Sequence, residues 1–133
     1  MIYSKLRILV PLDDPGAEEP LIRFAAALAQ TRKGELHLTH IITPNEAHPW
    51  NDEQLQWLAE LVTEYSVNAK SHIVEFQSVT HGIQETARRL QCNMMVMGWY
   101  HEVVKDAILT AQNRALAKAI GIDTLIFKDR NSF

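Results

Sequence analysis

Short apolar runs alternate with segments of helical periodicity along this chain, and that alternation is the feature that most limits how the chain can fold. Five runs predict strands, because each is rich in aliphatic residues and bounded by turn signals: 6–12, 35–42, 71–79, 93–98 and 123–128. Helical spacing falls between these runs, at 18–32, at 55–69, from Gly82 to about Leu90, and within 103–120. The pattern predicts an α/β fold with a mainly parallel sheet.

The expected helices carry local start and stop signals. Gly34 is placed to end the first helix, and Asn51 with Gln54 three residues later forms a capping-box pattern at the start of the second. The buried stripes predicted from helical spacing include Phe24 in the first helix and Tyr65 and Ala69 in the second. The third run alternates apolar and polar residues, which predicts a strand that is less completely buried than its neighbours.

Length and charge exclude several classes of function. With 133 residues, 47% of them hydrophobic, the chain is expected to form one domain over residues 1–133 with a core of its own. A net charge of -3 and a pI near 6.0 provide no basic surface, so nucleic acid is not an expected partner. The single cysteine and the lack of an apolar run of roughly 20 residues predict a cytoplasmic protein that does not insert into a membrane.

The order of several short motifs resembles the universal stress protein family over nearly the whole chain. The motifs are Ile8-Leu9-Val10-Pro11-Leu12-Asp13, Leu38-Thr39-His40-Ile41, the helix led by Gly82, and Val96-Met97-Gly98. The resemblance implies a doubly wound sheet of five parallel strands in the order 3-2-1-4-5, with helices on both faces, as in adenine nucleotide alpha hydrolase-like proteins. It also implies a homodimer that forms through the last strand, Asp123 to Lys128 in this chain.

The resemblance breaks down where the family's nucleotide-binding branch holds phosphate. In that branch the fourth strand is followed by glycine, two residues, a second glycine, nine residues, and then glycine with serine or threonine. Gly98 matches the first position, but His101 stands at the second and Ala111-Gln112 at the last pair. Larger side chains fill the space in which backbone N–H groups approach phosphate oxygens. We therefore predict a degenerate loop that binds ATP weakly or not at all.

Four residues match the other end of the family's pocket and form the predicted nucleoside-binding set. The resemblance implies that Asp13 contacts the nucleoside, Ile41 flanks the adenine, and Met97 with Gly98 forms the floor. All four lie at the carboxyl ends of expected strands, where open parallel sheets bind ligands. The alternative is structural: Asp13 caps the turn that follows it, and Ile41 and Met97 belong to the core. The prediction is that the protein carries no cofactor, with ATP or AMP as the disfavoured exception.

The other reactive side chains point to structural roles. His37 and His40 fall on opposite faces of one expected strand, and no HExxH or Cys/His spacing indicates a metal site. Cys92 precedes a buried strand without an obvious cationic neighbour, which predicts an inert buried thiol. Trp99 and Tyr100 form an expected recognition patch in the loop after the fourth strand.

Two functions remain open from the sequence. The first is a non-catalytic, dimerising regulatory domain. His81-Gly82-Ile83 and Met97-Gly98-Trp99 resemble stress-protein domains at the cytosolic ends of amino acid permeases and cation/proton antiporters, which adds a transporter membrane domain as an expected partner. The second is a nucleotide-binding stress protein with weak hydrolase or phosphotransfer activity, for which the sequence offers no Walker lysine and no assembled nucleophile triad.

Overall fold

A computed structural model describes residues 5–13, 18–44, 51–98 and 121–127 of the chain. Five parallel strands form one sheet in the order β3-β2-β1-β4-β5. The strands are β1 Arg7–Pro11, β2 Glu35–Ile42, β3 Asn68–Glu75, β4 Met94–Gly98 and β5 Asp123–Phe127. The described helices are α1 Glu19–Thr31, α2 Asp52–Val62 with the short 3-10 helix η1 Thr63–Tyr65, and α3 Val79–Arg89. The α/β class and the strand order predicted above are confirmed.

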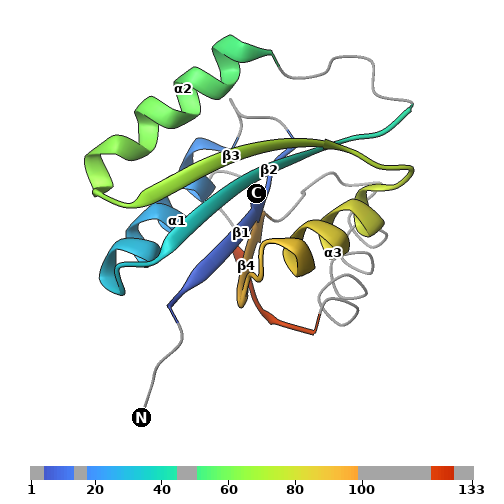
Figure 1. Ribbon diagram of the computed structural model, residues 1–133. Helices are drawn as coiled ribbons and strands as arrows, with labels where there is room; N and C mark the ends of the chain where they lie inside the picture. The colour runs from blue at the N-terminus through green and yellow to red at the C-terminus, as the bar shows by residue number, and fades with distance from the viewer. Residues whose placement is uncertain (1–4, 14–17, 45–50, 99–120, 128–133) are drawn as a thin grey trace.

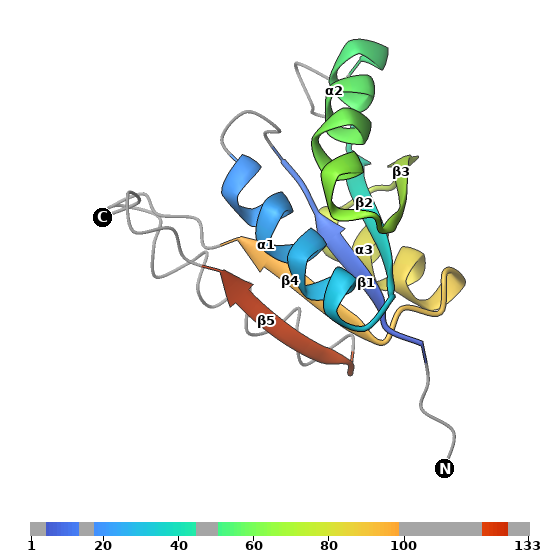
Figure 2. The same ribbon diagram turned by 90° about the vertical axis from the view of Figure 1, so that its left-hand side faces the viewer.

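Helices cover the sheet on both sides (Figure 1). α1 and α2 lie on one side, which we call the α1/α2 face, and α3 lies on the other, the α3 face. β3 and β5 form the two edges of the sheet (Figure 2). No residue of β3 is fully buried, so the prediction of a less buried third strand is confirmed.

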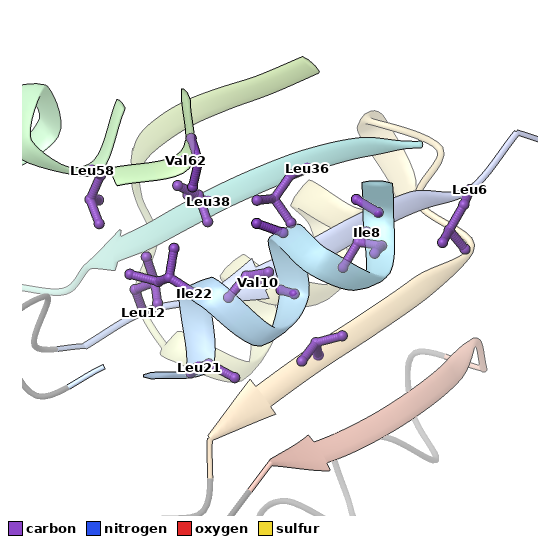
Figure 3. Packing of buried hydrophobic residues seen from close by; sticks show 14 residues of the cluster. Leu6, Ile8, Val10, Leu12, Leu21, Ile22, Leu36, Leu38, Leu58 and Val62 are labelled. Carbon is purple, nitrogen blue, oxygen red and sulfur yellow. The ribbon is translucent and has the colours of Figure 1, made fainter. Parts of the chain in front are cut away.

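The α1/α2 face carries the larger apolar cluster (Figure 3). Alternate residues of the central strands point into it and are almost entirely inaccessible to solvent, including Ile8, Val10, Leu36, Leu38 and Val96. The helices supply the opposing side chains, among them Leu21, Ile22, Ala25, Ala26, Leu58 and Val62. Burying one such leucine, isoleucine or valine side chain contributes ~1.5–3 kcal/mol, so this face is the main source of stability.

The α3 face combines an apolar cluster with polar side chains. Its apolar members come from β1, β2, β4 and α3, and include Leu9, Ile41, Ile83, Met95 and Met97. The residues that alternate with Leu36 and Leu38 on β2 lie on this face and are Glu35, His37, Thr39 and Ile41.

Helix α1 agrees with its prediction to within one residue at each end, but Phe24 and Gly34 do not behave as expected. Phe24 is 39% exposed and is not part of the buried stripe. The left-handed backbone after the helix falls on Lys33, with φ of 51°, rather than on Gly34. Gly34 is needed for a different reason: a Cβ there would lie 2.5 Å from the Leu6 carbonyl oxygen, where β1 and β2 begin side by side.

The second helix begins as predicted and ends early. Asn51 and Gln54 make both hydrogen bonds of the capping box, which confirms that prediction. The α-helix stops at Val62 and continues as η1, and Ser66 after η1 adopts a left-handed conformation with φ of 53°. Tyr65 therefore belongs to η1 and Ala69 to β3, although both pack against the α1/α2 cluster.

The boundary between the third strand and third helix also differs from prediction. β3 runs from Asn68 to Glu75 rather than over 71–79. α3 starts at Val79, three residues before Gly82, because the Ser78 side chain accepts a hydrogen bond from the His81 N–H and caps the helix. The helix expected within 103–120 lies outside the described residues, as do Trp99, Tyr100, His101, Ala111, Gln112 and Lys128.

Candidate functional site

The four residues of the predicted nucleoside-binding set lie at the carboxyl edge of the sheet. Met97 and Gly98 end β4, and Ile41 is the penultimate residue of β2. β1 and β2 stay in register past the end of β1, since the Leu12 N–H donates to the Thr39 carbonyl oxygen at 2.8 Å. Asp13 is the next residue and is exposed at this edge. The topology thus brings the set to the region where open parallel sheets bind ligands.

Asp13 is held by a residue that the sequence analysis missed. The Asp13 backbone N–H lies 3.1 Å from each carboxylate oxygen of Glu18 and donates to that group. Glu18 is the residue before α1, and its side chain makes no capping bond to the helix. Its carboxylate instead closes the connection from β1 to α1. The sequence did contain a signal for this role: Glu18 stands two positions before Pro20, at the start of a predicted helix, where an acidic side chain is favoured.

The Glu18 carboxylate affects which ligand suits this edge. Asp13 and Glu18 place two acidic side chains at the turn after β1. Carboxylates repel the phosphate chain of a nucleotide, and the repulsion grows with each added phosphate. A hydroxyl-rich ribose, in contrast, can donate hydrogen bonds to a carboxylate.

Ile41 and Met97 are core residues in this structure. They are 5% and 4% exposed and belong to the apolar cluster of the α3 face. Helix α3 covers Ile41 closely, because a Cβ added at Gly82 would lie 2.6 Å from its Cγ2 atom. The same added atom would lie 3.1 Å from the Phe76 ring. Gly82 therefore has a packing role, and the structural alternative raised for Ile41 and Met97 agrees with their burial.

Gly98 lies on the opposite side of β4 from Met97. A Cβ at Gly98 would come 3.5 Å from Leu21 Cδ2, which is an ordinary van der Waals contact. Packing against the described residues therefore does not require glycine at this position. Gly98 and Gly82 both belong to motifs of the family resemblance, but of the two only Gly82 is closely packed against described neighbours.

A hollow that the sequence analysis did not predict lies one strand further along the same edge. It has a volume of about 530 Å³ and is lined by Ile42, Thr43, Pro44, Glu75, Phe76 and Gln77. The four predicted residues do not line it. Phe76 borders the hollow, and its ring centroid is 5.7 Å from that of exposed His81. The hollow and the predicted set therefore share an edge but are separate features.

The remaining candidate side chains of the described chain are Cys92, His37 and His40. Cys92 is buried, and burial raises the pKa of its thiol to about 11, as expected for an unreactive cysteine. His37 and His40 lie on opposite faces of β2, and His40 donates from Nδ1 to the Leu12 carbonyl oxygen at 2.7 Å. Within residues 5–13, 18–44, 51–98 and 121–127, no group of three or more metal-binding side chains is arranged to hold an ion. Over the same residues, no helix has the length and apolar character needed to cross a membrane.

Comparison with known proteins identifies the class to which this fold and edge belong. The model of the universal stress protein family matches residues 6–128, so the chain belongs to that family. A search of curated protein sequences gives no match.

Solved structures agree with the family assignment. A universal stress protein from Archaeoglobus fulgidus is 18% identical with a TM-score of 0.68, and the alignment covers 95% of this chain and 94% of that one. A universal stress protein in complex with cAMP is 13% identical with a TM-score of 0.74, covering 93% and 97% of the two chains. A family protein from Arabidopsis thaliana with AMP bound is 10% identical with a TM-score of 0.66, covering 95% and 94%. At these identities the comparisons establish the fold.

Proposed function

We propose that this universal stress protein domain is non-catalytic, acts in the cytoplasm as a homodimer, and regulates other proteins through its dimeric form. The observation that carries the proposal is the edge strand β5, in which Leu125 and Ile126 are 40% and 41% exposed. These side chains alternate across the strand, so both faces of the edge are apolar. An exposed apolar edge strand pairs readily with another strand, and a second copy of β5 is the matching partner.

Light scattering coupled to size exclusion tests the dimer. The wild-type chain should elute at twice 15.2 kDa. Ile126→Glu places a charge in the apolar edge and should give a monomer, and Ile126→Pro, which cannot donate a ladder hydrogen bond, should give a monomer or an aggregate. Val79→Glu is the matched control, since Val79 is an exposed apolar residue of α3, and this variant should remain dimeric. A wild-type monomer at high micromolar concentration rules out the dimer.

For a ligand, the proposal names a nucleoside or nucleoside monophosphate at the carboxyl edge. Asp13 is exposed after β1, at the edge where β2 and β4 also end, and Glu18 adds a second carboxylate at this turn. The two carboxylates suit the hydroxyl groups of a ribose better than a triphosphate. Family structures bound to dAMP, cAMP and AMP support nucleotides as the ligand class for this chain.

Thermal unfolding tests the ligand. AMP at about 100 times its dissociation constant stabilises the native state by ~2.7 kcal/mol, whereas Mg-ATP at low micromolar concentration should give no shift. Asp13→Ala should abolish the AMP shift, and Glu60→Ala, which removes an exposed carboxylate from α2, should leave it unchanged. A nucleoside panel that gives no shift, or an Asp13→Ala variant that responds like wild type, excludes nucleoside binding at Asp13. Dimerisation would remain a separate question.

The alternative function is a nucleotide-binding stress protein with weak hydrolase or phosphotransfer activity. Nucleotide complexes of family members favour it over other enzymatic roles. It predicts that ATP survives purification or binds stoichiometrically, and that product forms in proportion to protein. Calorimetry with Mg-ATP separates the two functions, because saturable low-micromolar binding is expected only from this alternative.

A narrower proposal is that the domain belongs to a transporter. Its support is the local resemblance at His81-Gly82-Ile83 and Met97-Gly98-Trp99. Gly82 already has a packing role against Ile41, so that part of the resemblance reflects the placement of α3. Immunoblotting of fractionated cells tests the idea. A membrane-bound band much larger than 15.2 kDa supports it, and a 15.2 kDa band confined to the soluble fraction contradicts it.

A further inference from the structure

A line of polar side chains joins β2 to the edge strand β3 on the α3 face. His37 of β2 places Nδ1 2.9 Å from Nε2 of His72 on β3, and its Nε2 3.2 Å from Oε2 of Glu35. The His37 side chain is only 3% exposed, and that of Glu35 is 13% exposed. The two imidazole rings are also stacked, with centroids 5.2 Å apart. This line is the most deeply buried set of titratable groups joined to one another in the described chain.

Charged groups surround this line on several sides. Arg7 of β1 lies 3.1 Å from the Glu35 carboxylate, and Lys5, two residues before Arg7, lies 3.5 Å from it. From β3, Lys70 contributes positive charge near both histidines. α3 contributes apolar side chains to this face, and its Glu85 pairs with Arg88 and Arg89. β4 contributes the apolar side chain of Met95. The Cys92 thiol, which precedes β4, interacts electrostatically with Arg7 and Glu35.

The geometry limits how many protons the two histidines can hold. When both are neutral, the His72 Nε2–H donates to His37 Nδ1 and the His37 Nε2–H donates to Glu35, so the bonds are satisfied. One added proton is tolerated: His37 then donates from both nitrogens, and His72 accepts at Nε2 with its own hydrogen on Nδ1. A second added proton puts an N–H on each of the facing nitrogens. Neither can accept, and two positive rings then meet at 2.9 Å.

We propose that the His37–His72 contact is an acid-sensitive link that holds edge strand β3 on β2 at neutral pH and releases it when both imidazoles are protonated. β3 is the element best placed to respond, because it is half-exposed and has a strand neighbour on one side only. β1 and β4 pack through buried apolar residues that do not titrate, including Ile8, Val10, Met95 and Val96.

The direction of the pH dependence follows from burial. Removal from water lowers the pKa of both histidines. For His37 this effect outweighs the Glu35 carboxylate, which raises the pKa, and the charges of Arg7 and Lys70 lower it further; for His72 the neighbouring His37 and Lys70 add to the lowering. The opened strand binds more protons than the closed one once the pH falls below the ordinary histidine pKa of about 6.5. The link is therefore at full strength above that value. The link weakens as the pH falls from about 6.5 toward the lowered pKa values of the two histidines.

Hydrogen exchange read by peptide mass spectrometry on the full chain tests this link. After correction for the intrinsic effect of pH, lowering the pH from 7.5 to 5.5 should reduce protection of the β3 peptide. The loss at pH 5.5 should be at most about tenfold for each histidine, because that pH lies about one unit below the ordinary histidine pKa. Peptides of β1 and β4 should keep their protection. The position of the peptide that loses protection also distinguishes this link from an effect of His40, because the hydrogen bond from His40 to Leu12 joins β2 to β1.

Two histidine variants complete the test. His72→Gln keeps a donor for His37 when neutral, and its amide oxygen can accept when His37 is charged, so β3 should stay protected at pH 5.5. His81→Gln is the matched control, because His81 is exposed on α3 and should leave the wild-type pH dependence intact. Equal protection of wild-type β3 at the two pH values overturns the proposal, as does a uniform loss in every strand. A His72→Gln variant that opens like wild type also overturns it.

Discussion

The two faces of the sheet are built from the same strands but differ in chemistry. The α1/α2 face is an apolar cluster, with His40 at its margin bonded to a backbone carbonyl. The α3 face is divided: Ile41 and Met97 lie toward the carboxyl edge, and Glu35, His37 and His72 lie toward the other end. The difference separates two roles: the α1/α2 face supplies most of the apolar packing, whereas the histidine link and two residues of the predicted nucleoside-binding set, Ile41 and Met97, lie on the α3 face.

The largest effect is expected from the α1/α2 face. Ile8 is completely buried between Leu36 of β2 and Met94 of β4 in the sheet register. Ile8→Ala removes buried methyl groups and leaves a cavity, so it should lower the free energy of unfolding by ~2–5 kcal/mol, measured by urea denaturation. The loss should be equal at pH 7.5 and pH 5.5, because nothing that is removed titrates.

Ile8→Val serves as the graded control for that experiment. It removes one methylene and should cost ~0.5–1.5 kcal/mol at both pH values. A loss for Ile8→Ala that changes by more than about 1 kcal/mol between the two pH values would show that the faces are coupled. The two faces of the sheet would then not contribute to stability independently of each other.

The apolar face was the part of the fold that could be predicted from sequence. Its strands and helices repeat apolar residues at periods of 2 and 3.6, and those periods are local properties of the chain. The strand order came from the family resemblance and was confirmed. Boundaries were less predictable, because they depend on single residues: the left-handed Ser66 ends η1, and the Ser78 side chain caps α3.

The α3 face was harder to predict, because its key contacts join distant residues. The sequence correctly placed His37 and His40 on opposite faces, but the partner of His37 is 35 residues away on β3. That contact depends on the register between β2 and β3, which places Lys70 beside His37 and His72 beside Thr39. At the carboxyl edge, topology was enough to gather Asp13, Ile41, Met97 and Gly98. The hydrogen bond from Asp13 to Glu18 and the close fit of Gly82 on Ile41 could not be predicted, because both depend on the positions of side chains in the folded chain.

A pair of glycine variants sharpens the comparison at the carboxyl edge. Gly82→Ala puts a methyl group 2.6 Å from Ile41, so α3 must shift, with an expected loss of ~1–3 kcal/mol in the free energy of unfolding. Gly98→Ala meets Leu21 at 3.5 Å and should change stability by less than ~0.5 kcal/mol. Urea denaturation of both variants measures the difference. Equal losses would show that the packing of α3 on β2 is looser than these distances imply.

The smallest effect is expected at the polar end of the α3 face. Glu35→Gln removes the charge that pairs with Arg7 and Lys5 but keeps an oxygen that can accept from His37. The expected loss is ~1 kcal/mol at pH 7, because these pairs are only partly shielded from water. The hydrogen bond from His37, together with Arg7 and Lys5, lowers the pKa of the Glu35 carboxyl, so its contribution is present above about 4.3 and fades as the pH falls below that value.

Urea denaturation at several pH values between 7 and 3.5 measures the difference between Glu35→Gln and wild type. The difference should narrow as the pH falls, which is the opposite of the constant loss expected for Ile8→Ala. Glu60→Gln is the matched control: Glu60 is exposed on α2 and bonds to Gln56, so this variant should stay within ~0.5 kcal/mol of wild type throughout. A Glu35→Gln loss that stays constant or grows in acid would show that the charge of Glu35 does not stabilise the fold, and the contrast between the two faces would then rest on His37 and His72 alone.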